Sequence, residues 1–332
     1  MSAKNHRSSI RDVAKAAKVS IATVSRVINH PELTSPQIQS RVFKAIKECN
    51  YITNDLKIND PVKNIAFFSL DISNPFYILV VKELLSLTSH RNINLIIYET
   101  SDFESEKKSF EHCLRSNVDG IIYSAGYSRE EFKLGANCSI PIALIDHDCF
   151  IDMPAYSISS DNDKMLQLLI NYLYHLGHRK IAFLYTTENT TIHYRLDAYI
   201  KYIKAYDLNI NKNFIYQSFK YGEDAGIEAF DYFYSLTNPP TAVIASNDQV
   251  AHGFIMRALS LGIKIPEDFS VCGIDGIDGF YYPSITSVRQ NIHEIAKNAL
   301  DYVLNPSSIA VPYEKKIDVT FKLGMTCRKL LE

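Results

Sequence analysis

The sequence predicts a small all-α head followed by a larger α/β body, which consists of two lobes with doubly wound parallel sheets. Three observations lead to this fold class. Two short helical patterns joined by a tight turn begin at Ile10, short apolar runs alternate with helical patterns from Lys63 onward, and the net charge changes sign between these parts. A chain of 332 residues is also longer than one typical domain, which agrees with such a division.

The segment 10–29, IRDVAKAAKVSIATVSRVIN, has the pattern of two helices with a turn between them. Apolar residues at helical spacing give the first helix one buried face, and Val24, Val27 and Ile28 do the same for the second. Ser20 follows a break in the pattern and can cap the second helix through its hydroxyl group. Two helices joined in this way form a helix-turn-helix unit, whose second helix enters the major groove of DNA. An ordinary helical hairpin would show the same apolar spacing.

A third helix is expected from Pro36, because Ser35 precedes it and proline is tolerated in the first turn of a helix. This helix would complete a head over residues 1–50. Its predicted apolar face consists of Ile38, Val42, Phe43 and Ile46.

Net charge favours DNA binding over a plain hairpin. Residues 1–50 contain nine Lys and Arg but three acidic residues, so the head carries +6 and residues 51–332 carry −8 of the total of −2. A basic head on an acidic body indicates that contact with nucleic acid is confined to one end. The candidate DNA contacts from the second helix are Ser20, Ile21, Ala22, Thr23, Ser25, Arg26 and Asn29.

The run 19–29, VSIATVSRVIN, and the NYIT that follows the third helix resemble the head of the LacI/GalR family of bacterial transcription regulators. In that family the linker, here residues 51–62, forms a hinge helix whose leucine enters the DNA minor groove. The resemblance would give this role to Leu56, but the linker departs from the usual hinge pattern, because Thr53 replaces the family's proline and no Ala-Arg-x-Leu follows. An ordinary linker leucine would look the same. Lys18 stands in a turn where the family usually has glycine, which adopts a left-handed conformation most easily.

The body has the alternating pattern of βαβ units, which indicates parallel sheets covered by helices. Its strands are nearly continuous apolar runs, as in sheets that are buried on both faces. The expected strands are residues 65–70, 95–99, 120–124, 142–146, 181–185, 242–246 and 270–274. The expected helices are residues 76–90, 104–116, 161–176, 192–206, 223–236 and 248–261.

Two series of these units, residues 63–160 and 161–289, would form the two lobes. The family resemblance continues through DISNPFY, ASNDQVAHG, PSITSVRQ and other runs, and it implies a periplasmic-binding-protein-like architecture in which the chain crosses back between lobes. A helix at 291–304 would then lie in the first lobe and a strand at 317–323 in the second. The implied returning segments are residues 290–316 for the first lobe and 317–332 for the second.

Polar residues directly after the strands are candidate ligand contacts, because open α/β sheets bind ligands beyond the carboxyl ends of their strands. Carboxylates, amides and a guanidinium would suit the paired hydroxyls of a sugar. Asn247 and Asp275 would equally suit caps of a helix and a turn. Position and family resemblance together give the effector candidates Asp71, Phe76, Tyr77, Asp146, Arg195, Asn247, Asp275 and Gln290. Of these, Phe76 or Tyr77 would stack on a sugar ring.

No catalytic site, metal site or cofactor is expected. The sequence contains neither a phosphate loop nor a GxSxG motif, and its six cysteines include no CxxC pair. It also has no run of eighteen apolar residues and an N-terminus without an apolar signal segment, so we expect a cytoplasmic protein without a membrane span.

The leading hypothesis is a repressor of sugar-utilisation genes, controlled by a small effector bound between the lobes. We expect a homodimer, because paired heads read pseudo-palindromic operators in double-stranded DNA. The alternative is a cytoplasmic sugar-binding protein or a sugar-processing enzyme on the same α/β fold.

Overall fold

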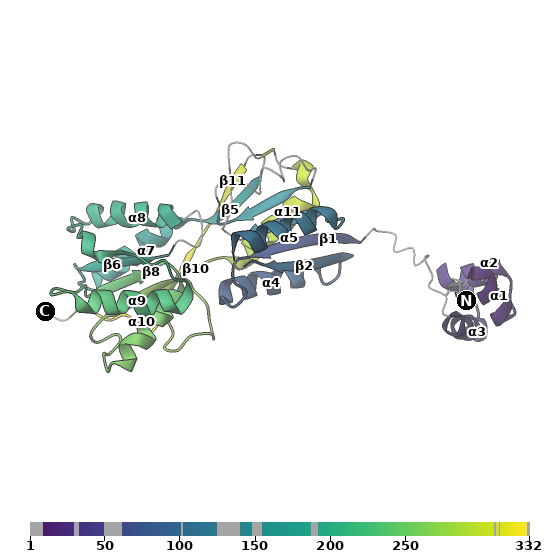
Figure 1. The fold of residues 1–332 in the computed structure, drawn as a ribbon, viewed down its shortest axis with the longest axis horizontal. Coiled ribbons are helices and arrows are strands. Elements are labelled where there is room, and N and C mark those ends of the chain that lie inside the picture. The colour runs from purple at the N-terminus through teal and green to yellow at the C-terminus, as the bar shows by residue number, and fades with distance from the viewer. Residues whose placement is uncertain are drawn as a thin grey trace. The chain divides into compact units, whose positions relative to one another are not determined.

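The computed structural model describes residues 9–29, 33–49, 62–100, 102–124, 140–147, 155–186, 192–308, 310–311 and 313–330. The chain forms two compact units, Met1–Val62 and Lys63–Glu332 (Figure 1). None of the helices in the described ranges is long and apolar enough to cross a membrane.

The first unit is a head of three helices, α1 (Ile10–Ala17), α2 (Ile21–Asn29) and α3 (Pro36–Glu48). The cap predicted for α2 is confirmed, since Ser20 Oγ accepts a hydrogen bond from the Thr23 N–H at 3.0 Å. The buried core of the head consists of Val13, Ala14, Ala17, Val24, Val27, Val42 and Ala45.

The prediction for the apolar face of α3 was wrong at one position. Phe43 is 51% exposed, whereas Ala45 is buried. Successive residues of an α-helix are rotated by about 100°. Ala45 therefore lies on the same side as Ile38 and Val42, and the ring of Phe43 is turned toward solvent.

The turn between α1 and α2 contains Lys18 in the left-handed conformation, with φ 51° and ψ 48°. The backbone N–H of Val19 donates to the Ala14 carbonyl at 3.0 Å. Arg41 of α3 donates through Nη2 to the carbonyls of Ala17 and Lys18, at 2.7 and 3.2 Å. The Arg41 side chain of the third helix therefore fixes the turn between the first two.

The first lobe of the body is built on a six-stranded parallel sheet, with strand order β11-β5-β4-β3-β1-β2. Its strands are β1 (Lys63–Ser69), β2 (Ile93–Glu99), β3 (Gly120–Ser124), β4 (Ile142–Ile145), β5 (Tyr156–Ser160) and β11 (Tyr313–Ile317). Helices α4 (Pro75–Thr88) and α11 (Ile292–Leu304) pack on one face, and α5 (Phe103–Arg115) packs on the other.

The second lobe repeats this arrangement with strand order β12-β10-β9-β8-β6-β7, in which only β12 runs antiparallel to its neighbour. Its strands are β6 (Ile181–Tyr185), β7 (Ile215–Gln217), β8 (Ala242–Ala245), β9 (Ser270–Asp275), β10 (Thr286–Arg289) and β12 (Thr320–Lys322). The helices α7 (Asn162–His175) and α8 (Ile192–Ala205) cover one face, and α9 (Gly222–Ser235) and α10 (Asp248–Ser260) cover the other. Short 3-10 turns occupy Lys212–Phe214 and Pro306–Ser308.

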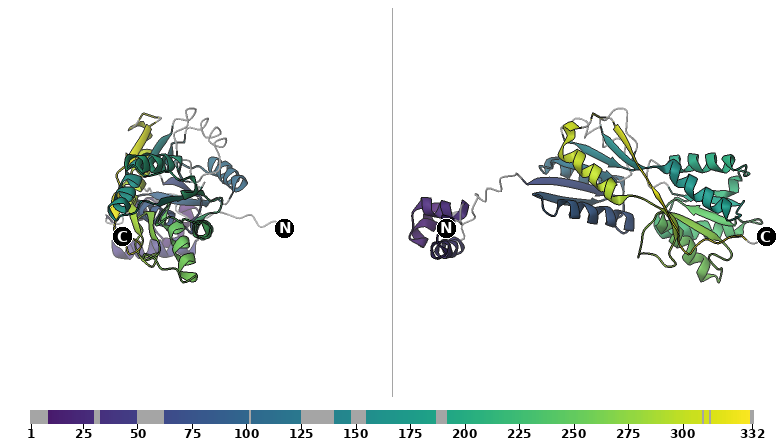
Figure 2. Two further views of the ribbon diagram at one scale, coloured as in Figure 1. Left: turned by 90° about the vertical axis from the view of Figure 1, so that its left-hand side faces the viewer. Right: turned by 180° about the vertical axis from the view of Figure 1, so that it is seen from behind.

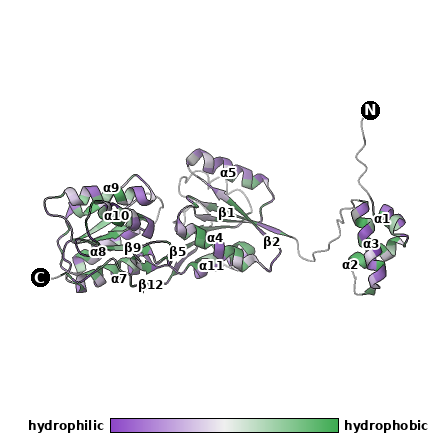
Figure 3. Cartoon of the chain, turned by 90° about the horizontal axis from the view of Figure 1, so that it is seen from below, coloured by the Kyte–Doolittle hydropathy of each residue, from purple (hydrophilic) through white to green (hydrophobic). Residues whose placement is uncertain are grey.

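Both lobes thus have helices on each face of a central sheet, as Figure 2 shows in two further views. The helices carry hydrophobic and hydrophilic residues along their lengths, in agreement with one face packed on a sheet (Figure 3). The predicted fold class, a helical head with two mainly parallel α/β lobes, is confirmed.

The described chain passes between the lobes three times. These crossovers connect β5 to α7, β10 to α11, and β11 to β12. The strand expected at 317–323 in the second lobe is present as β12, but it is shorter than expected, because β11 still occupies Ile317 in the first sheet and β12 starts at Thr320. Strands β5, β7 and β10 were not predicted, since their sequences mix polar and apolar residues.

Candidate functional site

The outer face of α2 carries the candidate DNA contacts. Ser20, Ile21, Ala22 and Arg26 are exposed, whereas Thr23 and Ser25 are partly buried. The hydroxyls of Ser20 and Thr23 lie 2.8 Å apart and are hydrogen-bonded to each other at the start of the helix. The side chain of Asn29 and the whole of Leu56 lie outside the described residues. Roles in DNA contact remain predictions for all of them.

Among the effector candidates, Arg195 is hydrogen-bonded to two different segments of the second lobe. Its guanidinium is buried and donates through Nε to Asn162 Oδ1 at 2.8 Å and through Nη1 to the Ser246 carbonyl at 2.6 Å. Asn162 begins α7 directly after the first crossover, and Ser246 follows β8. Arg195 therefore joins a crossover to the carboxyl end of a central strand of the second lobe.

Asp275 and Gln290 form a second buried group. Gln290 Nε2 donates to Asp275 Oδ1 at 2.7 Å, and Gln290 Oε1 accepts from Ser160 Oγ at 2.6 Å. Asp275 has φ 124°, a backbone conformation that side chains other than glycine rarely adopt. Burial and the neighbouring Asp248 carboxylate raise the pKa of Asp275 well above its ordinary value, and Arg195 opposes this effect.

Asp146 follows β4 of the first lobe and has φ 54°. Its backbone N–H donates to the Ile158 carbonyl at 2.9 Å, which fixes its place beside β5. Burial raises the pKa of Asp146, while the positive charge of Arg195 lowers it. The two lobes therefore place opposite charges close enough to interact.

Four buried polar atoms have no hydrogen-bond partner within the described part of the chain. They are Ser69 Oγ, Asp146 Oδ1, Ser246 Oγ and Tyr281 Oη. The first three atoms belong to residues at or directly after the carboxyl ends of strands, and the fourth lies in the loop after β9. Buried unpaired groups of this kind cost about 1–3 kcal/mol each, so a ligand that satisfied them would gain binding free energy.

Three of these residues, Ser69, Ser246 and Tyr281, were not among the sequence-based candidates. The rule that found Asp146 and Asp275 could also have found Ser69 and Ser246, because both occupy strand ends. Nothing in the sequence distinguishes Tyr281 from the many other tyrosines.

The aromatic candidates lie in the core of the first lobe. Phe76 and Tyr77 are 5% and 7% exposed, and their rings make an edge-on contact with centroids 5.4 Å apart. Asp71 accepts hydrogen bonds from the N–H and hydroxyl of Ser73, at 2.8 and 2.6 Å, in a local turn before α4. Asn247 Oδ1 accepts from the Val250 N–H at 2.8 Å, so it caps α10 as its alternative interpretation proposed.

Two surface cavities border the crossovers. One of about 560 Å³ is lined by polar residues that include Asn162, Tyr194, Lys201 and Lys316, and it touches none of the effector candidates. A smaller one of about 290 Å³ includes Arg289 and Gln290 in its lining. Within the described ranges no group of three or more His, Cys, Asp or Glu is placed to hold a metal ion.

Comparison with known proteins identifies both parts of the chain. Residues 9–54 match the bacterial regulatory proteins of the lacI family, and residues 170–308 match the periplasmic binding protein-like domain. The transcriptional repressor PurR of Vibrio vulnificus is 30% identical over 305 residues, which cover 89% of this chain and 90% of PurR. The transcriptional repressor CytR of Escherichia coli K12 is 26% identical over 303 residues, which cover 89% of each protein.

Solved structures show the same fold. The Lac repressor bound to ONPG in its repressed state aligns with a TM-score of 0.79 and 22% identity, covering 97% of this chain and 100% of the other. The CelR–cellobiose complex aligns with a TM-score of 0.70 and 20% identity, covering 96% and 100%. The curated relatives CytR and PurR are transcriptional repressors, which removes the enzyme alternative. The chain therefore belongs to the lacI family of bacterial regulatory proteins, as a DNA-binding transcriptional repressor with a periplasmic-binding-protein-like effector domain.

Proposed function

We propose that this repressor controls sugar-utilisation genes and that a sugar bound between its two lobes sets its affinity for the operator. The observation that carries the proposal is the set of unpaired buried polar atoms at the strand ends of both lobes. A sugar hydroxyl donates and accepts hydrogen bonds at once, so it can satisfy both carboxylate and hydroxyl partners.

The charges and amides around these atoms support the same ligand class. Asp146 and Asp275 supply acceptors, Arg195 supplies a planar donor group, and Asn247 and Gln290 supply amides. Among proteins of this fold, CelR is described in complex with cellobiose and an Enterococcus faecium regulator with bound ribose.

In the head, we propose that the exposed residues of α2 read the operator. Arg26 is suited to a bidentate contact with guanine, which is the commonest specific contact in the major groove. The exposed methyl groups of Ile21 and Ala22 would contact thymine methyls. The linker lacks the usual hinge pattern, so we propose that the spacing of two heads matters more to the switch than a wedge formed by Leu56.

We also propose that the protein works as a homodimer on DNA in the cytoplasm. One head reads only a few base pairs, and two-fold symmetric proteins read longer, palindromic sites. Exposed apolar side chains on α4 of the first lobe and on α10 of the second could be covered by a second copy. They are Ile78 and Leu85 on α4 and Met256 and Leu259 on α10. Both helices lie along the lower side of the lobes in Figure 1, and a related structure is described as a Lac repressor dimer bound to operator.

Effector control would follow from contacts with both lobes. Asp146 belongs to the first lobe, and Arg195 and Asp275 belong to the second. A ligand that contacts both sets stabilises the closed arrangement over the open one, and it shifts the equilibrium only by this difference in affinity. Closure would change the spacing of the two first lobes in the dimer, and hence the spacing of the heads.

A thermal-shift screen tests the ligand class, because a ligand that binds the folded state raises its stability by mass action. The panel would contain pentoses, hexoses, disaccharides, nucleosides and nucleobases. We expect at least one sugar to raise the melting temperature of the wild-type chain. Stabilisation by nucleosides or nucleobases alone would contradict the proposal for a sugar effector.

Two variants test the assignment of the site. Arg195→Lys keeps a positive charge but loses the planar donor group, so we expect it to lose most of the sugar-induced shift while still binding DNA. Arg257→Lys is the matched control, because Arg257 pairs with Asp231 on the second lobe at 2.8 Å.

A separate variant tests the linker. Leu56→Ala should lose little operator affinity, and loss of all binding would instead establish a wedge mechanism.

A further inference from the structure

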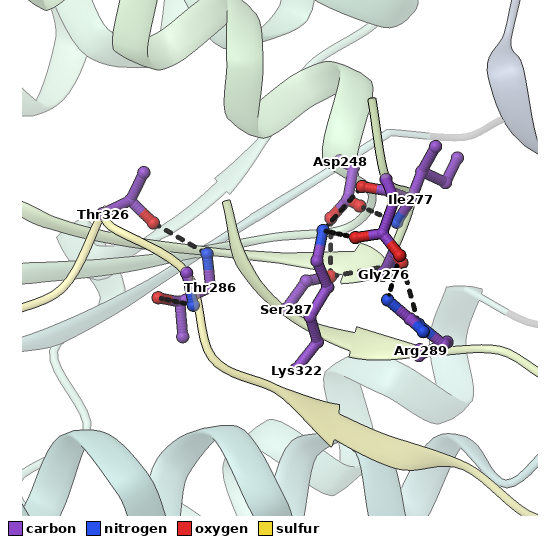
Figure 4. Close-up of polar contacts among 10 residues, drawn as sticks. Asp248, Gly276, Ile277, Thr286, Ser287, Arg289, Lys322 and Thr326 are labelled. Atoms are coloured by element: carbon purple, nitrogen blue, oxygen red, sulfur yellow. Dashed lines mark hydrogen bonds and ion pairs between the residues drawn. The ribbon is translucent and has the colours of Figure 1, made fainter. Parts of the chain in front are cut away.

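The turn at the end of β9, residues 275–278, is bound by side chains of other segments (Figure 4). Asp248 Oδ2 accepts a hydrogen bond from the Ile277 N–H at 2.9 Å. Ser287 donates its hydroxyl to Asp248 Oδ1 at 2.6 Å and accepts from the Gly276 N–H at 3.1 Å. Both backbone donors at the centre of this turn are therefore satisfied by side chains.

The carbonyl groups of the same turn accept hydrogen bonds from two basic side chains. Lys322 Nζ donates to the Ile277 carbonyl at 2.6 Å and lies 3.2 Å from Asp278 Oδ1. Arg289 donates through Nε to the Gly276 carbonyl at 3.1 Å and forms an ion pair with Asp278. All four backbone polar groups of Gly276 and Ile277 thus have side-chain partners, which come from α10, β10 and β12.

The surrounding backbone leaves room for this arrangement. A Cβ atom on Gly273 would lie 2.1 Å from Asp248 Oδ1, so the carboxylate approaches β9 where only glycine fits. Gly276 has φ 67°, and a Cβ there would lie 2.4 Å from Arg289 Cα. Asp248 is fully buried, and burial raises its pKa to about 7 while the hydrogen bond from Ser287 lowers it.

A helix-capping role does not account for Asp248. It is the first residue of α10, but the side chain that caps this helix is that of Asn247, through Val250. Both carboxylate oxygens of Asp248 are used by other segments instead.

The turn connects several parts of the molecule that would have to move together. Asp275 at its start is an effector candidate, and Ile277 is 4% exposed within the apolar cluster of the first lobe. Arg289 directly precedes Gln290 at the second crossover, and Lys322 lies in β12, just beyond the third. The turn belongs to the second lobe but is attached to the first lobe and to two of the crossovers.

We propose that Asp248 is a positioning residue that fixes the 275–278 turn. The Asp275 carboxylate and the second and third crossovers then respond to the effector as one unit. This proposal rests on the proposed effector site for its role in the switch. A ligand that moves or restrains Asp275 then acts on the crossovers through the side chains that hold the turn.

Hydrogen exchange measured by mass spectrometry on the full chain, without ligand, tests this role. Asp248→Asn replaces one acceptor oxygen by an NH2 group, so the side chain can no longer accept from both the Ile277 N–H and the Ser287 hydroxyl. The Gly276 N–H is affected through Ser287, which is its acceptor. We expect exchange of the Gly276 and Ile277 amides to become roughly tenfold faster or more, in line with the loss of a charged hydrogen bond. Exchange at the crossovers, residues 290–292 and 317–320, should become faster as well.

The matched control is Asp231→Asn on α9, because Asp231 likewise accepts a hydrogen bond on each carboxylate oxygen, in its case from Arg257 at 2.8 and 3.2 Å. This variant should leave hydrogen exchange in the turn and at the crossovers unchanged. Two further variants, Ser287→Ala and Lys322→Met, remove partners of the turn while Asp248 remains. They should show the same local pattern, and they carry the test if Asp248→Asn does not fold.

A role limited to the stability of the second lobe would give a different pattern. Exchange would then rise evenly in β8, α10 and the turn, which would overturn the proposal. Faster exchange in the turn with unchanged crossovers would overturn the coupling. The ligand screen is independent of these results: if no sugar stabilises the wild-type chain, the proposed effector class fails, while the exchange data still decide the role of Asp248.

Discussion

Gln290 donates its side-chain N–H to the carboxylate of Asp275 at 2.7 Å, and both residues are almost completely buried. The same amide accepts the hydroxyl of Ser160 at 2.6 Å, at the end of β5. One side chain therefore connects two crossovers to the end of β9. An amide suits this position because it donates to a carboxylate and accepts from a hydroxyl at the same time.

Gln290→Ala should leave the Asp275 carboxylate and the Ser160 hydroxyl without this partner. We expect the free energy of unfolding to fall by about 1–3 kcal/mol, the usual cost of buried groups left unpaired. Urea denaturation followed by circular dichroism measures the change. Gln217→Ala is the control, since Gln217 is exposed and its side chain accepts the Tyr185 hydroxyl at 3.1 Å. Equal losses in both variants would contradict the importance of the buried amide.

Arg26→Ala should weaken binding to a selected operator by about 1–3 kcal/mol and relax the preference at one base pair. Operators would be selected from random DNA and their affinities measured by fluorescence anisotropy. Lys44→Ala is the control, because Lys44 is exposed on α3 and lies 3.9 Å from Glu48. We expect it to weaken specific and random DNA alike. If Arg26→Ala did the same, Arg26 would contact phosphate and not a base.

Sequence patterns predicted most of the fold because its local and tertiary preferences agree. The strands of both sheet centres are continuous apolar runs, and Ser20 caps α2 as its position indicated. The missed strands β5 and β10 contain serines that are buried and hydrogen-bonded, such as Ser160 and Ser287. A buried serine with a partner and an exposed serine in a loop look the same in a sequence.

The candidate site was predictable to the extent that strand ends determine it. Asp146 and Asp275 follow strands and are buried close to the positive charge of Arg195, as the position rule indicated. The role of Asp248 was not predictable, because it follows the helix cap Asn247 and would be taken for a residue of the same cap. Only the tertiary arrangement shows that its carboxylate faces the 275–278 turn.

Lys18→Gly should stabilise the head by about 1 kcal/mol, because Lys18 has a left-handed backbone conformation that side chains disfavour. Protection of the α1 and α2 amides from hydrogen exchange measures this effect in the full chain. Lys15→Gly removes the same charge from the last turn of α1, where the backbone is helical and glycine is disfavoured. The two variants should therefore change protection in opposite directions. A loss of protection in Lys18→Gly would show that the lysine side chain stabilises the turn by more than its backbone conformation costs.

The dependence of stability on pH should reflect the buried carboxylates of Asp248 and Asp275. Burial raises the pKa of Asp248 from 3.8 to about 7, and it also raises that of Asp275. Between pH 3.8 and about 7, the Asp248 carboxyl group of the folded state holds a proton that the unfolded state has released. Stability from these groups is therefore fully present below about pH 4 and is lost as the pH rises toward 7.

Asp248→Asn removes one of these titrating groups. The free energy of unfolding of this variant should therefore fall less steeply between pH 4 and 7 than that of the wild type. One proton fewer changes the slope by at most about 1.4 kcal/mol per pH unit. Urea denaturation at several pH values measures both slopes, and the difference between them cancels the contributions of the histidines. Asp318→Asn is the opposite control, because the hydrogen bond from Lys164 lowers the pKa of Asp318 and its stabilisation is lost as the pH falls. Parallel curves for Asp248→Asn and the wild type would show that Asp248 is already ionised at pH 4.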